Sequence, residues 1–234
     1  MRKSEFEAIL TECCDTLTNE AQSTGFTSSL QFENRVRQVL DKLTKDSKLF
    51  TIDFAPHPQA FPDIAMGDFG VEVKFSMNDT WRSVANSVLE TQRIETVKHI
   101  YIVFGKMGGV PEVRWGEYEQ SVIHVRTSHV PRFEVEIPTE GAAVKQSLFV
   151  DMGIRYDDFR KLEMQEKMKY IRTYARKIHP DGRLWWIEEK ESDEHTVPIQ
   201  ARLYTNLSTS EKNRLRAEAA LLCPKIGNHP QGYS

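Results

Sequence analysis

The spacing of apolar residues in the first part of the chain predicts two amphipathic helices. The first covers 3–20, and its apolar positions at helical spacing are Phe6, Ile9, Leu10 and Leu17. The second covers 29–43, with Ser28 or Ser29 available as its N-cap. Its apolar stripe consists of Phe32, Val36, Val39, Leu40 and Leu43. Gly25 ends the first pattern before the second begins.

The pattern then changes to short apolar runs. Strands are expected at 49–54, 63–66, 70–75, 99–104 and 121–126. A helix is expected over 81–90, with Asp79 and Thr80 as its cap. The run over 99–104 is continuously apolar, which is typical of a strand buried on both faces. This order of elements predicts an α/β protein with a mixed sheet.

The remainder of the chain adds helices and one strand. A long helix is expected over 156–178, ended by Pro180 and Gly182, and an apolar strand follows over 184–187. The last predicted helix begins at Ser208 or Ser210 and runs to Leu222. With 234 residues, the chain suits one large domain, with a core at about 29–126 and an elaboration at about 140–226.

Charged residues interrupt one of the apolar runs. Glu72 and Lys74 lie within 69–75, and Asp63 follows Pro62 shortly before it. Because side chains alternate along a strand, Glu72 and Lys74 project from one face while the apolar residues between them project from the other. A hairpin between the strands would bring Asp63 beside Glu72. The sequence therefore predicts two carboxylates and a lysine at one place.

This set of groups suits phosphodiester hydrolysis. Carboxylate oxygens hold hard cations, which stabilise the extra charge on the phosphate oxygens, and Mg²⁺ usually takes only one or two protein carboxylates. Lys74 would orient or help to deprotonate the attacking water. A simpler explanation is a solvated Glu and Lys pair on an exposed strand. The Pro-Asp pair, the apolar flanks and the glutamate-bearing helix before it favour the nuclease explanation.

The same residues resemble the active-site motif of the PD-(D/E)XK nuclease superfamily, at Pro62, Asp63, Glu72, Val73 and Lys74. The resemblance implies a restriction-endonuclease-like αβββαβ core. It also implies Mg²⁺ as cofactor, with Mn²⁺ as a substitute, bound by Asp63, Glu72 and the carbonyl of Val73. Many members carry a further catalytic glutamate on the first core helix, and Glu33 matches it. The alternative for Glu33 is a first-turn glutamate favoured by the helix dipole.

Composition limits the other possibilities. The net charge of −3 argues against indiscriminate nucleic-acid binding, but it is compatible with a local basic cleft. The three cysteines, Cys13, Cys14 and Cys223, lack zinc-site spacing and are expected to be reduced thiols, with a vicinal redox pair as the alternative. The sequence contains no long apolar run and no signal-peptide pattern, so we expect a cytoplasmic protein without a membrane contact.

Two segments are candidates for contacting DNA. Arg126, His129 and Arg132 follow a predicted strand end, and such donors suit phosphate oxygens and base edges. The alternative is a polar loop with internal hydrogen bonds. Within 155–183, nine Lys or Arg residues against five Asp or Glu leave a local charge of +4. The helical face there consists of Lys169, Arg172 and Arg176, with a solvated surface as the alternative.

The resemblance, together with these patterns, implies a sequence-specific, Mg²⁺-dependent endodeoxyribonuclease similar to type II restriction enzymes. Its partner would be double-stranded DNA, cut by a homodimer on both strands. A cognate DNA methyltransferase is expected in the host, but not as a stable partner. The alternatives are a repair or nicking nuclease of the same superfamily, or a catalytically inactive DNA-binding module.

Overall fold

A computed structural model describes residues 2–45, 60–89, 93–126, 131–138 and 145–178, together with residues 210, 211, 213, 214 and 217. The chain forms two compact units, 1–184 and 185–234, and all the elements below belong to the first. The strands predicted over 49–54 and 184–187 lie outside the described residues, as do His129 and Cys223. The five described positions within the predicted helix over 208–222 are helical.

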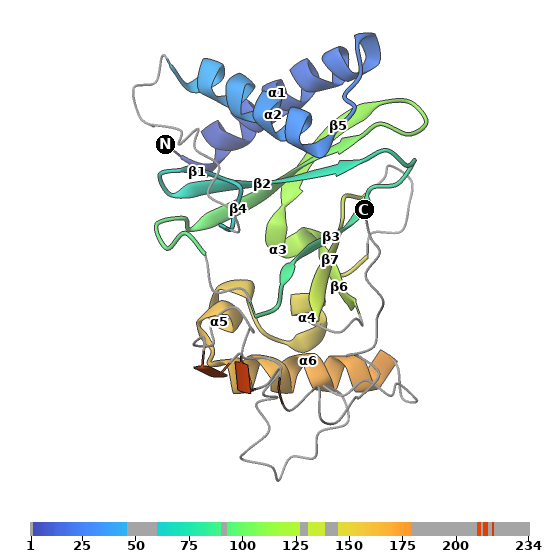
Figure 1. The fold of residues 1–234 in the computed structure, drawn as a ribbon. Coiled ribbons are helices and arrows are strands. Elements are labelled where there is room, and N and C mark those ends of the chain that lie inside the picture. The colour runs from blue at the N-terminus through green and yellow to red at the C-terminus, as the bar shows by residue number, and fades with distance from the viewer. Residues whose placement is uncertain are drawn as a thin grey trace, which may run out of the picture. The chain divides into compact units, whose positions relative to one another are not determined.

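Two helices cover one face of a four-stranded sheet (Figure 1). The helices are α1 (Lys3–Ser23) and α2 (Ser29–Thr44), and Ser28 caps α2 by accepting a hydrogen bond from the N–H of Gln31. The strands are β1 (Ile64–Met66), β2 (Phe69–Ser76), β4 (His99–Lys106) and β5 (Glu112–Glu117). Their order is β1-β2-β4-β5, with β2 and β4 parallel and the other pairs antiparallel. The chain is therefore a mixed α/β protein.

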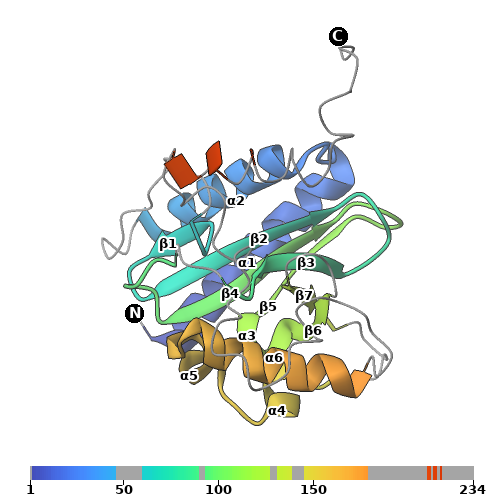
Figure 2. The same ribbon diagram turned by 60° about the horizontal axis from the view of Figure 1, so that its bottom comes forward.

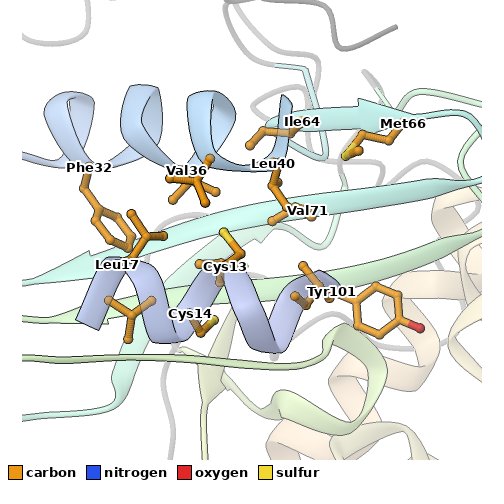
Figure 3. Close-up of a cluster of buried hydrophobic side chains, with 14 of the residues drawn as sticks. Cys13, Cys14, Leu17, Phe32, Val36, Leu40, Ile64, Met66, Val71 and Tyr101 are labelled. Atoms are coloured by element: carbon orange, nitrogen blue, oxygen red, sulfur yellow. The ribbon is translucent and has the colours of Figure 1, made fainter. Parts of the chain in front are cut away.

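The core lies between these helices and the sheet. Phe32, Val36 and Leu40 point from α2 toward the strands, and Cys13 and Leu17 lie on α1 (Figure 3). Burial raises the pKa of the Cys13 thiol to about 12, and that of Cys14 also lies well above its usual value. Both thiols are therefore protonated core groups, which argues against a redox pair.

The helix predicted over 81–90 is wrong. Residues Arg82–Ser87 form strand β3, which pairs with β7 (Arg132–Glu136) in a second sheet. This three-stranded sheet has the order β3-β7-β6 and includes β6 (Val122–Arg126) (Figure 2). Asp79 caps no helix, since β3 follows it, and its Oδ1 accepts a hydrogen bond from Lys106 Nζ at 2.6 Å. The connection between the parallel strands β2 and β4 thus contains a strand where the αβββαβ core requires a helix.

Pairing with β7 explains this difference. The segment 82–87 is rich in Ser, Asn and Val, which are weak helix formers, so partners elsewhere in the fold decide its conformation. Arg82 pairs with Glu136 across the two strands at 2.8 Å. The hydroxyl of Tyr118, on the short helix α3 (Tyr118–Ser121), donates a hydrogen bond to Asn86 Oδ1. Strand pairing satisfies the backbone and these polar side chains together.

The helix predicted over 156–178 is interrupted. The structure has α4 (Leu148–Met152), then α5 (Tyr156–Lys161) and α6 (Met164–Ile178), with Leu162 extended between the last two. On one straight helix, the buried residues of α5 would project roughly 120° away from those of α6, at 100° per residue. The break lets both apolar faces pack. Among the described helices, none is long and apolar enough to span a membrane.

Candidate active site

The turn before β1 places the carboxylate of Asp63 against β2. The N–H of Val73 donates a hydrogen bond to Asp63 Oδ2 at 2.7 Å. The β1–β2 register pairs Ile64 with Val71, so its continuation puts Asp63 opposite Glu72. Gly70 makes this approach possible, because a Cβ there would lie 2.4 Å from Cγ of Pro62. The hairpin predicted from the sequence is confirmed.

Glu72 and Lys74 lie on the same face of β2. Lys74 Nζ donates a hydrogen bond to Glu72 Oε1 at 2.8 Å, and the two side chains are only 16 % and 7 % exposed. On the opposite face, Val71 belongs to the core beneath the helices. The predicted alternation is therefore confirmed, and a solvated surface pair does not describe this strand. Glu72 Oε2 is buried and has no hydrogen-bond partner among the described residues.

The electrostatics of the site favour a proton or a cation. Burial and the neighbouring charge of Glu72 raise the pKa of Asp63 to about 7. The Val73 N–H and the charge of Lys74 lower the pKa of Asp63, and the charge of Glu33 raises it further. Two carboxylates this close repel one another when both are ionised, and a bound cation or proton relieves that repulsion.

The N–H and the carbonyl of Val73 lie on the same edge of β2. In an antiparallel pair, the N–H and C=O of one residue point toward the same neighbouring strand. The carbonyl of Val73 therefore points toward the edge where its N–H meets Asp63. Pro62 does not extend the ladder to Val73, because its ring lies against Gly70. The arrangement is compatible with the predicted role of Val73 as a ligand.

The donor set fits a hard divalent cation. Asp63, Glu72 and the Val73 carbonyl offer only oxygen atoms, and the buried, unpartnered Oε2 of Glu72 is an acceptor that a cation would satisfy. Within the described residues, no cluster of three or more His, Cys, Asp and Glu side chains could hold a metal by itself. An ion that keeps several waters and takes few carboxylates, such as Mg²⁺, suits the site better than one that needs a complete protein cage.

Glu33 is joined to the site by a residue that the sequence analysis missed. Glu33 Oε1 forms an ion pair with Arg37, one turn further along α2, at 2.7 Å. The same terminal nitrogen of Arg37 donates a hydrogen bond to the main-chain carbonyl of Asp63. Glu33 lies beyond the first turn of α2, so the helix-dipole explanation does not apply. The spacing of four between Glu33 and Arg37 was the available signal.

A second missed residue, Arg93, lies beside the same turn. Its guanidinium is 5.9 Å from the centre of the Phe61 ring and 5.5 Å from that of Tyr156. Arg93 also donates hydrogen bonds to the Tyr156 hydroxyl and to the carbonyl of Val97. The cluster attaches helix α5 to the residues that precede Asp63. The sequence offered no signal for it, since these residues lie far apart along the chain.

The structure brings together two of the predicted DNA-contacting residues. Arg126 and Arg132 are paired in register across β6 and β7, and both are exposed. They belong to the three-stranded sheet, whereas Asp63, Glu72 and Lys74 belong to the four-stranded one. The neighbouring ring of His124 is hydrogen bonded to Tyr174 of α6 at 2.9 Å, so it is engaged within the fold.

The basic face predicted near the C-terminal side is part of α6. Met168, Ile171 and Ala175 are its buried side. Lys169 and Arg176 are exposed, and Arg172 is partly exposed. The three basic residues therefore share the accessible side of the helix, as their spacing predicts, and their contact with DNA stays a prediction.

The sequence matches no model of a known protein family, and a search of curated proteins finds no relative. The similarity to the PD-(D/E)XK superfamily therefore depends on the five motif residues and on the geometry described above. It does not extend to the order of elements, because β3 replaces the expected helix.

Proposed function

We propose that the protein is a Mg²⁺-dependent endodeoxyribonuclease that hydrolyses phosphodiester bonds at specific sites in double-stranded DNA. The observation that carries this proposal is the meeting of Asp63, in the turn before β1, with Glu72 and Lys74 on β2, where one buried oxygen of Glu72 lacks a partner among the described residues. Buried charges are costly to a fold unless they are paired or bind an ion. Their convergence beside a lysine is more readily explained by chemistry than by stability.

Each residue has a distinct task in this proposal. Asp63, Glu72 and the Val73 carbonyl hold the cation, which when bound supplies positive charge against the phosphate oxygens. The Val73 N–H fixes the orientation of the Asp63 carboxylate. Lys74, held by Glu72, orients the attacking water and stabilises negative charge on the phosphate.

The direct test is digestion of a DNA of known sequence by the purified protein with Mg²⁺, followed by mapping of the ends. Discrete ends at a repeated sequence would support a site-specific endonuclease. Nicks at mismatches or branched structures would favour the alternative of a repair or nicking nuclease. DNA binding without cleavage under any divalent cation would instead favour the inactive DNA-binding module.

The oxygen ligands lead to a prediction about metals. Mg²⁺ or Mn²⁺ should support cleavage, whereas Ca²⁺ should support DNA binding with little turnover, because Ca²⁺ accepts looser geometry and polarises water less. Cleavage rates and gel-shift affinities measured with each cation would check this. Full activity in a chelator, with no added cation, would contradict the proposed mechanism.

A second prediction concerns Arg126 and Arg132. If either one reads a guanine, its alanine variant should lose ~1–3 kcal/mol of binding and relax discrimination at one base position. If it contacts only phosphate, binding should weaken for all sequences and depend less on salt. Lys145→Ala is the control, since Lys145 pairs with Glu136 near the other end of β7. Unchanged affinity and salt dependence in both arginine variants would show that the paired strands β6 and β7 have a structural role and do not contact DNA.

We further expect a homodimer on DNA. One chain carries one set of Asp63, Glu72 and Lys74, so cleaving two antiparallel strands at once calls for two copies related by a two-fold axis. Sedimentation with and without a cognate duplex, together with a supercoiled-plasmid time course, would check this. A monomer in both states that accumulates nicked circles before linear product would contradict the dimer.

A further inference from the structure

Arg37 is a buried cation with two contacts that lead to the candidate site. The residue is 4 % exposed, on the inner side of α2. One terminal nitrogen contacts both the carboxylate of Glu33 and the main-chain carbonyl of Asp63. Burying a guanidinium costs free energy unless its N–H groups find good acceptors. A methionine or leucine would fill the space without this cost.

The acceptors of Arg37 indicate what its burial achieves. The Asp63 carbonyl belongs to the same residue whose side chain is held by the N–H of Val73. Asp63 is therefore held at two points, by α2 through its carbonyl and by β2 through its carboxylate. These two contacts restrict both the backbone and the side chain of a residue that must meet a cation in a defined position.

The contacts of Glu33 distinguish it from a residue that would bind the cation directly. Its Oε1 is committed to Arg37, and its side chain is 25 % exposed, compared with 7 % for Glu72. A carboxylate that accepts from a buried guanidinium orients that guanidinium, as the outer partners of metal ligands commonly do. Glu33 is thus placed to act on Asp63 through one intervening residue, Arg37.

We propose that Arg37 is a positioning residue that fixes Asp63, and that Glu33 acts on the site through Arg37 rather than by contacting the cation. This inference rests on the proposed function for its consequence in catalysis. The alternative is that Arg37 only anchors α2 to the sheet. A purely structural role would affect the whole sheet, whereas positioning affects Asp63 first.

The test uses the full chain with Arg37→Met, Arg37→Lys and Glu33→Ala, and the double variant Arg37→Met with Glu33→Ala. The first readout is hydrogen exchange of the Val73 amide, which reports the bond to Asp63, with the Val103 amide on the adjacent β4 as internal control. We expect Arg37→Met to accelerate exchange at Val73 at least tenfold relative to Val103. Equal acceleration at both amides would overturn the positioning role.

The second readout is the affinity for Mn²⁺ in the absence of DNA. We expect Arg37→Met to weaken binding at least tenfold and Arg37→Lys to weaken it less. Glu33→Ala should weaken binding in the wild-type background and have little further effect when Arg37 is already replaced. An equal loss in both backgrounds would identify Glu33 as an independent ligand and overturn the second half of the proposal.

These readouts do not depend on DNA cleavage. If the wild-type protein cuts no DNA but Arg37→Met still accelerates hydrogen exchange selectively at the Val73 amide, the proposed function fails while the positioning role stands. If Arg37→Met does not fold, Arg37→Lys and Glu33→Ala still decide the outcome, because the first keeps a cation at position 37 and the second keeps Arg37 itself. Wild-type exchange at Val73 and wild-type Mn²⁺ affinity in both of these variants would overturn the inference.

Discussion

Replacing Lys74 with alanine should slow DNA cleavage at least ~10²-fold, in keeping with the loss of a general acid–base or electrostatic group. The ammonium lies 2.8 Å from Glu72 Oε1 and is largely shielded from water, so its charge is weakly screened. Specific DNA binding should remain, because Lys74 is assigned to water and phosphate charge and not to base edges. Single-turnover rates and gel-shift affinities would separate the two effects.

Asp63→Ala should behave in the same way, since it removes a proposed ligand. The matched control is Lys98→Ala, immediately before β4, because Lys98 forms an exposed pair with Asp68. This variant should cleave like the wild type, since exposed pairs contribute little. Cleavage at the wild-type rate by either Lys74→Ala or Asp63→Ala would end the assignment of the active site.

The part of the fold that local pattern determines was predictable. The stripes of α1 and α2, and the alternation of Val71, Glu72, Val73 and Lys74, follow from the periods of helix and strand. The structure confirms these patterns, because the apolar residues that repeat at helix or strand spacing are the ones that are buried. The meeting of Asp63 with Glu72 was also predictable, because a tight hairpin makes it a local event.

What could not be predicted depends on partners distant in sequence. Arg82–Ser87 is a strand because β7, about 50 residues later, pairs with it. A capping sequence before Trp81 made a helix the better local expectation, and tertiary pairing overrode it. The Arg93 cluster depends on Phe61 and Tyr156 in the same way. Arg37 is an intermediate case, since its spacing from Glu33 was visible but its contact with Asp63 was not.

Asp63→Asn should stabilise the cation-free protein at neutral and alkaline pH, even though it should abolish cleavage. The ordinary pKa of an aspartate is 3.8, and in the folded protein that of Asp63 is about 7. Between these values the folded state holds a proton that the unfolded state has lost, so the stability of the wild type falls as pH rises. A difference of this size corresponds to a cost on the order of 4 kcal/mol above pH 7.

Asparagine avoids this cost because it is neutral and still offers an oxygen to the N–H of Val73. In a chelator, the free energies of unfolding of the two proteins should agree near pH 4 and diverge up to about pH 8, with the variant more stable. At roughly 2–4 °C per kcal/mol for a protein of this size, the divergence is measurable as a difference in melting temperature. Asp68→Asn, at an exposed position, is the control and should show no such divergence.

Adding Mg²⁺ should reverse the order of the two proteins. A cation that binds the folded wild type stabilises it in proportion to the logarithm of cation concentration over the dissociation constant, whereas the variant has lost a ligand. Melting temperatures at pH 8 should therefore rise with Mg²⁺ for the wild type and stay nearly constant for Asp63→Asn. Parallel pH curves for the two proteins in chelator would show that Asp63 carries no such cost. A Mg²⁺ response shared by both would place the cation elsewhere.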